Sequence, residues 1–238
     1  SSDLHMNKNL TALIILDGYG FTRCTEGNAV EQAQTPFLDA ISQDYPHTLI
    51  TASGLGVGLP EGQMGNSEVG HLNLGAGRIV YQELTRITKS IQDGDFFENP
   101  AFLEAVKNCK ENNSTLHLYG LLSDGGVHSH INHVVALMQI AAKAGVKPVI
   151  HAIMDGRDTA PKAGRQYLAR ILETIKSTGG EIATISGRFY TMDRDKRWER
   201  TKLAWDALVK GIGTSATDPL SALEDAYAAG ETDEFVKP

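Results

Sequence analysis

The sequence predicts an α/β protein whose mostly parallel sheet is covered by helices on both faces. Short, continuous apolar runs of the β type alternate along the chain with segments in which apolar residues recur at helical spacing. A parallel strand that is buried on both faces carries such an uninterrupted run, and the helix that follows it turns one apolar stripe toward the sheet. With 238 residues, the chain is long enough to bury a substantial core.

Four apolar runs are predicted to be strands. The first, at 12–16, reads Ala-Leu-Ile-Ile-Leu and stops at Asp17-Gly18, a pair that favours a turn. The other three are Leu116–Leu122, Val149–Met154 and Ile182–Ile185. Runs of this length are far too short to cross a bilayer as helices, so we expect strands inside a core.

Three helices are predicted from apolar residues at positions i, i+3, i+4 and i+7. The three sets are Ile131, Val134, Val135 and Met138; Leu168, Ile171, Leu172 and Ile175; and Trp205, Leu208, Val209 and Ile212. A further helical pattern runs from Tyr81 to Ile91.

The region from Gly54 to Gly77 interrupts this alternation with eight glycines in 24 positions. Glycine loses the most backbone entropy on folding, so this density favours either a long surface loop or a backbone that approaches a ligand closely. We place a domain boundary after it, which gives a first domain over 7–79 and a second over 80–238. Residues 1–6 read as the remnant of an expression tag. The last residues, 231–238, contain no predicted strand or helix, as if the second domain were truncated.

Charge and cysteine content exclude several classes of protein. The 22 Lys and Arg against 29 Asp and Glu give a formal charge of −7, whereas a general nucleic-acid binder needs a basic face. The two cysteines, Cys24 and Cys109, cannot build a disulfide framework, and no export signal opens the sequence. We therefore expect a cytoplasmic protein with reduced thiols and with neither a nucleic-acid nor a membrane partner. A local arginine cluster or a bound metal still allows an anionic substrate.

Two candidate residues lie in the first predicted domain. Asp17 directly follows the first predicted strand, where a carboxylate suits a hard metal ion or a general base; the alternative is an ordinary Asp-Gly turn. Ser67 follows glycines and is expected at the N-terminus of a helix. There it is either a nucleophile that a metal or base activates, or a plain N-cap. The sequence has no Gly-x-Ser-x-Gly elbow, phosphate loop or dinucleotide fingerprint.

The remaining candidates follow strands of the second predicted domain, at the edge of the sheet where ligands of α/β proteins bind. His128, His130 and His133 have a spacing that allows a zinc site, although a histidine at a strand end more often hydrogen-bonds a substrate or a carboxylate. In Arg157-Asp158, an arginine that can bind an anion lies beside a carboxylate that can accept a proton. Arg188 and Arg194 have planar guanidinium groups, which suit phosphate or carboxylate. Together these strand ends predict a pocket for a small, multiply anionic molecule.

Five motifs resemble those of the cofactor-independent (2,3-bisphosphoglycerate-independent) phosphoglycerate mutases. They are Leu16–Gly20, Gln63–His71, Leu122–His130, Asp155–Asp158 and Gly187–Arg194. The similarity runs in order from about residue 10 to the C-terminus, and the stretch MGNSEVGHLNLGAGR at 64–78 is very specific.

The resemblance implies a metal-dependent isomerase of the alkaline-phosphatase superfamily that interconverts 3-phosphoglycerate and 2-phosphoglycerate in glycolysis. It implies an alkaline-phosphatase-like domain, here its leading part only, with an inserted α/β phosphotransferase domain. Ser67 would be the nucleophile that becomes phosphorylated and, with Asp17, a metal ligand. The complete enzyme is expected to bind two Mn²⁺, with Mg²⁺ and Zn²⁺ as alternatives, and to be a monomer. His128, Arg157, Asp158, Arg188 and Arg194 would hold the glycerate, with Asp158 also exchanging protons with its hydroxyls.

Family members are much longer than this chain, and their later portion carries most of the metal ligands. We therefore expect that this chain alone is inactive as a mutase. Three other functions are weighed against the mutase: a metal-dependent phosphatase or phosphopentomutase of the same superfamily, a zinc hydrolase built on His128, His130 and His133, and a non-catalytic module that binds anions.

Overall fold

The computed structural model describes residues 11–238, so the predicted tag remnant at 1–6 lies outside the described residues. A three-stranded parallel sheet in the order β1-β2-β3 lies at the centre of the second half of the chain. The strands are β1 (Leu116–Leu121), β2 (Pro148–Met154) and β3 (Glu181–Gly187). All three predicted strands of this region are confirmed, and the α/β class with them.

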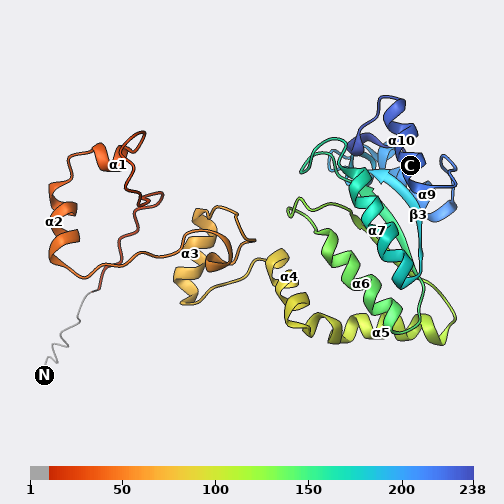
Figure 1. The fold of residues 1–238 in the computed structure, drawn as a ribbon, viewed down its shortest axis with the longest axis horizontal. Coiled ribbons are helices and arrows are strands. Elements are labelled where there is room, and N and C mark those ends of the chain that lie inside the picture. The colour runs from red at the N-terminus through yellow and green to blue at the C-terminus, as the bar shows by residue number, and fades with distance from the viewer. Residues whose placement is uncertain (1–10) are drawn as a thin grey trace, which may run out of the picture.

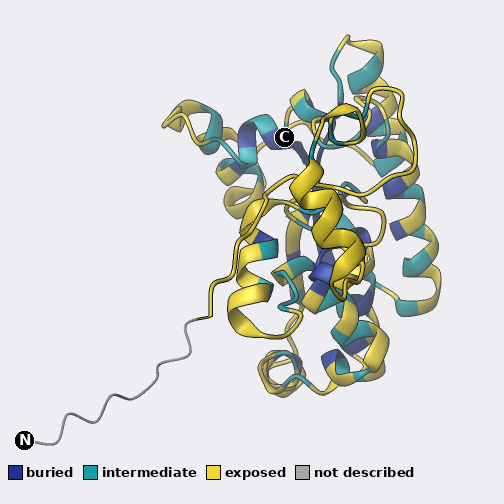
Figure 2. Ribbon diagram, turned by 90° about the vertical axis from the view of Figure 1, so that its left-hand side faces the viewer, coloured by how far each residue is buried: buried dark blue, intermediate teal, exposed yellow. Residues whose placement is uncertain are grey.

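Helices α6 (Ile131–Lys143) and α7 (Gly164–Thr178) connect the strands and pack on the sheet. Their predicted apolar stripes are the buried ones, because Met138 of α6 and Leu168 of α7 lie in one cluster with Ile150 of β2. Figure 2 shows the buried residues gathered at this sheet and on the helix faces that cover it. The helices predicted from apolar residues at positions i, i+3, i+4 and i+7 are therefore confirmed for α6 and α7.

A second apolar cluster joins the helices before β1 to the far side of α6. These elements are α4 (Glu83–Asp93), η2 (Asp95–Glu98) and α5 (Pro100–Glu111). Phe96, Val106 and Cys109 pack there against Ile140. Cys109 is thus a buried free thiol. We call residues 83–238 the α/β domain below.

The C-terminal elements are α8 (Arg188–Thr191), α9 (Trp198–Lys210), α10 (Pro219–Ala228) and the 3₁₀ turn η3 (Asp233–Phe235). The prediction that 231–238 contains no structure is wrong, because Asp233 and Val236 are buried and the Gly187 N–H donates to the Val236 carbonyl, at 2.7 Å. The short polar sequence gave no periodic signal, since the turn is held by single hydrogen bonds rather than by an apolar stripe.

Helix α9 exists, but its predicted apolar stripe does not face a core. Trp205, Leu208 and Val209 are exposed, and Ala204 is the buried residue of the helix. Ile212 lies beyond the helix, which ends where Gly211 takes a left-handed conformation (φ 66°). The pattern predicted the helix correctly and the burial incorrectly, because spacing alone does not say whether anything covers the stripe.

The first 40 described residues contain two short helices, α1 (Ala29–Gln32) and α2 (Pro36–Asp44), which Figure 1 shows well apart from the sheet. None of the residues 11–50 is buried. The predicted strand at 12–16 is wrong for this structure: the segment has no strand conformation, and Ile14 is 81% exposed. A strand needs hydrogen-bonding neighbours, and no other strand of residues 11–238 pairs with it.

The glycine-rich region forms a small lobe with the 3₁₀ turn η1 (Gly54–Val57) and helix α3 (Ser67–Ala76). A single antiparallel bridge joins Ser53 to Met64. Here the glycines let backbone approach backbone: a Cβ on Gly65 would lie 2.2 Å from the Ala52 carbonyl oxygen, where Gly65 donates its N–H. None of the helices in residues 11–238 is long and apolar enough to span a membrane.

Candidate functional site

Ser67 and Asp17 are 50 residues apart in sequence, and the structure brings their side chains into contact. The Ser67 hydroxyl donates a hydrogen bond to Asp17 Oδ2, and both residues are exposed. Asp17 lies in a turn in which the Tyr19 N–H donates to the Leu16 carbonyl. The pair therefore presents a hydroxyl and a carboxylate oxygen to solvent at one point.

Ser67 is the first residue of α3, as predicted, but it is not the N-cap. Asn66 has that role, because its side chain accepts the N–H of Val69 at 3.0 Å. The Ser67 hydroxyl is therefore not used for capping. It lies at the positive end of the helix dipole, where backbone N–H groups favour a negative charge.

In the α/β domain, a buried carboxylate that was not among the predicted site residues organises the strand ends. Asp155, 1% exposed, accepts hydrogen bonds from Ser123 Oγ at 2.6 Å and from Arg188 Nη1 at 2.7 Å. Asp155 also accepts the backbone N–H groups of Arg157 and Asp158. Burial alone would raise the pKa of Asp155, but these donors outweigh it and hold the pKa below its ordinary value.

Asp158 links this centre to the outer part of the site. It accepts a second hydrogen bond from Arg188 Nη1, at 2.6 Å, and its Oδ2 lies 3.6 Å from His128 Nε2. Arg188 is buried between the two carboxylates, which raise its pKa despite the opposing effect of burial. His128, Asp158 and Arg188 thus meet at one place, although they follow β1, β2 and β3 respectively in the sequence.

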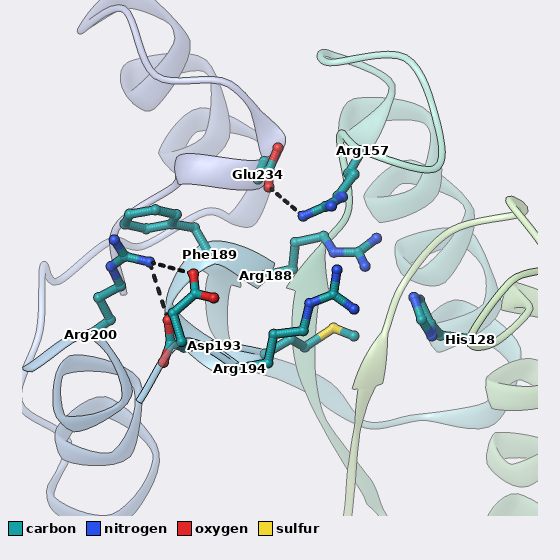
Figure 3. A pocket seen from close by; sticks show the side chains of 10 residues that line it. His128, Arg157, Arg188, Phe189, Asp193, Arg194, Arg200 and Glu234 are labelled. Atoms are coloured by element: carbon teal, nitrogen blue, oxygen red, sulfur yellow. Dashed lines mark hydrogen bonds and ion pairs between the residues drawn. The ribbon is translucent and has the colours of Figure 1, made fainter. Parts of the chain in front are cut away.

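His128 and Arg188 border a pocket of about 140 Å³, which we call the anion pocket (Figure 3). It is lined by His128, Arg157, Arg188, Phe189, Met192, Asp193, Arg194, Asp195, Arg200 and Glu234. Arg157 and Arg188 lie just after the ends of β2 and β3, Arg194 follows α8, and Arg200 belongs to α9. Four arginines around one pocket suit a ligand with phosphate and carboxylate groups.

The four arginines differ in how closely acidic side chains hold them. Two carboxylates fix Arg188, and Arg200 pairs with Asp193 at 3.1 Å while its guanidinium lies 3.9 Å from the centre of the Phe189 ring. Arg157 has a looser partner, Glu234, at 4.0 Å. Arg194 has no acidic group within 4 Å among residues 11–238.

The zinc interpretation of the three histidines is wrong for the described part of the chain. His130 caps α6 by accepting the Asn132 N–H, and His133 shares a hydrogen bond with Thr88 of α4. Burial lowers the pKa of both. His128 faces Asp158 instead, and no group of three potential ligands is placed to hold a metal ion in residues 11–238.

Hydrogen bonds and ion pairs gather the sequence-predicted residues into two groups. Ser67 and Asp17 form one, and the anion pocket with Asp158 forms the other; no such contact joins the two in the part of the chain that the structure describes. The sequence did not predict Arg200 and Glu234 as pocket residues, nor Asp155 as the buried partner of Arg188. Asp155 gave a usable signal, since it directly follows a buried strand, whereas Glu234 reaches the pocket only through tertiary packing.

Comparison with known proteins identifies relatives of this chain. The profile of the family described as "BPG-independent PGAM N-terminus" matches residues 87–238. A 2,3-bisphosphoglycerate-independent phosphoglycerate mutase of Lachnoclostridium phytofermentans is 57% identical over 235 residues, and one of Clostridium botulinum is 58% identical over the same length. Each match covers 98% of this chain and 46% of the relative, so the chain spans about half the length of these proteins.

A solved structure shares the fold. Crystal structures of Leishmania mexicana phosphoglycerate mutase at low cobalt concentration include a chain that superposes with a TM-score of 0.68 at 34% identity. The match covers 87% of this chain and 40% of that one.

Proposed function

The chain belongs to the family of 2,3-bisphosphoglycerate-independent phosphoglycerate mutases, and from this premise we propose that it carries the glycerate pocket and the reactive serine of an isomerase. The reaction interconverts 3-phosphoglycerate and 2-phosphoglycerate. The observation that carries the proposal is the anion pocket, which is lined by His128 and four arginines, with Asp158 in contact with His128 and Arg188 beside it. Residues 7–79 would contribute Ser67 and Asp17, and residues 80–238 would form the phosphotransferase domain.

In this proposal the arginines keep the glycerate bound while the phosphoryl group is transferred. Arg157 and Arg194 are the two whose guanidinium groups are not fixed by close carboxylates, so they bind the charged groups of the ligand. Arg188 is locked between Asp155 and Asp158, so two carboxylates offset its charge and it fixes the base of the pocket. The positive charge that stabilises a phosphoryl group during transfer comes from Arg157 and Arg194.

Asp158 and His128 handle the hydroxyl groups. The Asp158 carboxylate lies between Arg188 and His128, and it exchanges protons with a glycerate hydroxyl as acid or base. His128 fixes the other hydroxyl or the carboxylate by a hydrogen bond. A bound glycerate can thus present either of its two oxygens to the phosphoryl group, as a mutase requires.

Ser67 receives the phosphoryl group. Its hydroxyl and Asp17 offer two oxygen donors at an exposed point, and this donor set fits a hard divalent cation such as Mn²⁺, with Mg²⁺ and Zn²⁺ as alternatives. A bound cation would supply the positive charge that makes a serine hydroxyl reactive at neutral pH. No group of three potential ligands is placed to hold a metal ion among residues 11–238, and the chain covers 46% of the relatives' length, so the proposal takes the other ligands of the two expected ions from the part of the relatives that this chain does not cover. We therefore expect little or no mutase turnover from this chain alone.

The proposal is tested by locating the phosphoryl group. A full-length enzyme carrying this segment is incubated with 3-phosphoglycerate, trapped by rapid acidification and analysed by peptide mass spectrometry. We expect a phosphoryl group on Ser67, its loss in Ser67→Ala, and its retention in the control Ser90→Ala. A phosphoryl group on another residue, or on none, would overturn the assignment.

The choice of substrate distinguishes the proposed mutase from a metal-dependent phosphatase or a phosphopentomutase of the same superfamily. The same enzyme is assayed with 3-phosphoglycerate and with ribose phosphates. The proposal expects isomerisation of 3-phosphoglycerate, whereas net release of phosphate or preference for the pentose would favour the other enzymes. A monomeric state and a cytoplasmic location remain predictions.

A further inference from the structure

Glu234 is an acidic side chain inside a pocket whose chemistry suits anions. It is 22% exposed, and its carboxylate lies 4.0 Å from Arg157 Nη1 (Figure 3). The Arg157 side chain is 56% exposed and has no closer acidic neighbour among residues 11–238. A fixed negative charge here attracts Arg157 and repels any anion that enters.

The backbone that carries Glu234 is held from behind by its neighbour Asp233, which is fully buried. The Asp233 carboxylate accepts the Gly164 N–H at 2.7 Å and a hydrogen bond from the Tyr227 hydroxyl, and its own N–H donates to the Pro161 carbonyl at 2.8 Å. The turn η3 is therefore tied to the start of α7 and to α10.

Two glycines let η3 lie directly on the ends of β2 and β3. A Cβ on Gly156 would lie 2.7 Å from the Glu234 nitrogen, and a Cβ on Gly187 would lie 2.2 Å from its carbonyl oxygen. With the backbone this close on both sides, the main chain of Glu234 is fixed against the ends of β2 and β3. Arg157 has a long and half-exposed side chain, so it is the mobile partner of the pair.

We propose that Glu234 is a specificity-determining residue of the anion pocket. Glu234 pairs with Arg157 at the pocket wall until an entering anion replaces it as the partner of Arg157. This role rests on the proposed function, because the anion is taken to be a phosphorylated glycerate. Each ligand must replace Glu234 as the partner of Arg157 and must bind beside the Glu234 charge. The repulsion grows with the charge of the ligand, so Glu234 weakens the binding of phosphoglycerate more than that of glycerate and speeds its release.

The role predicts a gain of affinity when the charge is removed. In Glu234→Gln, the Kd for 3-phosphoglycerate should fall about fivefold, which is what an exposed ion pair of about 1 kcal/mol corresponds to. The Kd for D-glycerate should fall less. Titration of the ¹⁵N-labelled chain, followed on arginine side-chain NMR signals, gives both constants. Damage to the fold would weaken binding, so a gain is not explained by a merely structural role.

Two further variants test whether the effect passes through Arg157. In an Arg157→Gln background, Glu234→Gln should improve the Kd for 3-phosphoglycerate by less than half as much. The control Glu224→Gln makes the same charge change and breaks another Arg–Glu pair, with Arg165, outside the pocket. It should leave both Kd values unchanged.

The outcomes separate this inference from the proposed function. If the unaltered chain binds 3-phosphoglycerate and Glu234→Gln binds it equally or more weakly, the role of Glu234 is wrong while the glycerate pocket stands. A gain that is undiminished without Arg157, or that Glu224→Gln reproduces, also overturns the role. If neither the unaltered chain nor Glu234→Gln binds 3-phosphoglycerate, the glycerate pocket and the role of Glu234 both fail.

Discussion

Residues 11–50 and the α/β domain contain similar apolar runs, but these runs are exposed to solvent in the first region and buried in the second. Ile14 lies in an apolar run much like that of β2, yet it is exposed, whereas Ile150 of β2 is buried between neighbouring strands. Figure 2 colours the first described segment of the chain as exposed, and residues 11–50 include no buried residue. The difference is one of partners: β2 has β1, β3, α6 and α7, and 12–16 has no pairing strand among the described residues.

The two candidate sites differ in the same way. The anion pocket stands on buried groups, with Asp155 and Arg188 beneath it. Ser67 and Asp17 meet through one hydrogen bond between exposed side chains. The anion pocket is therefore organised within the α/β domain, whereas the contact between Ser67 and Asp17 is made by exposed side chains alone.

The largest effect is expected from removing the carboxylate beneath the pocket. Asp155→Ala leaves Arg188 buried with one of its two partners and deprives two backbone N–H groups of their acceptor. We expect a loss of about 3–5 kcal/mol in the free energy of unfolding, measured by urea denaturation. The exposed pair of Glu173 and Lys176 serves as the control, and Glu173→Gln should cost less than about 0.5 kcal/mol. Equal costs would show that the pocket is not built on a buried ion pair.

A matched pair of leucines tests the comparison of the two regions directly. Leu168 is 0% exposed and Leu13 is 74% exposed. Leu168→Ala should cost about 3 kcal/mol of unfolding free energy, because it leaves a cavity between α7 and the sheet, and Leu13→Ala should cost less than about 0.5 kcal/mol. If Leu13→Ala is as destabilising as Leu168→Ala, then residues 11–50 are buried in solution and the contrast is wrong.

The smallest effect concerns pH and the two buried aspartates. Hydrogen bonds hold the pKa of Asp155 below its ordinary 3.8, so its contribution to stability is present above pH 3.8 and is lost as pH falls through the folded-state pKa. Burial raises the pKa of Asp233, so its contribution is present below pH 3.8 and declines as pH rises through the folded-state pKa. The free energy of unfolding of Asp155→Asn, and separately that of Asp233→Asn, is subtracted from that of the unaltered chain between pH 3 and 7. As the pH rises, the difference should increase by about 1 kcal/mol for Asp155→Asn and decrease by about 1 kcal/mol for Asp233→Asn. Slopes of the same sign would contradict the two environments.

Sequence reasoning succeeded where the deciding contacts are local or repeat regularly. The runs at β1, β2 and β3 and the stripes of α6 and α7 match the structure because each element is covered by its neighbours in sequence. The same rules gave a strand at 12–16 and a buried stripe on α9, where no described element covers the apolar side chains. The spacing of apolar residues indicates that a segment needs another element to pack against, but it does not indicate whether the fold provides that element.

The part of the site that lies directly after the strands could be predicted from the sequence. His128, Arg157 and Arg188 follow β1, β2 and β3, so the parallel topology alone brings them to one edge. Glu234 was not predictable, because it reaches the pocket through a buried aspartate and two close backbone contacts. Its place depends on packing over a long sequence separation, which no local pattern records.

The most direct test of the account asks whether the α/β domain organises a glycerate site without further chain. Isothermal calorimetry with 3-phosphoglycerate is carried out on the 238-residue chain, on Arg194→Ala and on Arg165→Ala. Arg194 is exposed and lines the pocket, so its loss should spare the fold and weaken binding at least tenfold, whereas Arg165, paired with Glu224 outside the pocket, should be without effect. Binding by the unaltered chain that only Arg194→Ala weakens is the predicted result. No binding by the unaltered chain, or equal binding by all three, would contradict the account.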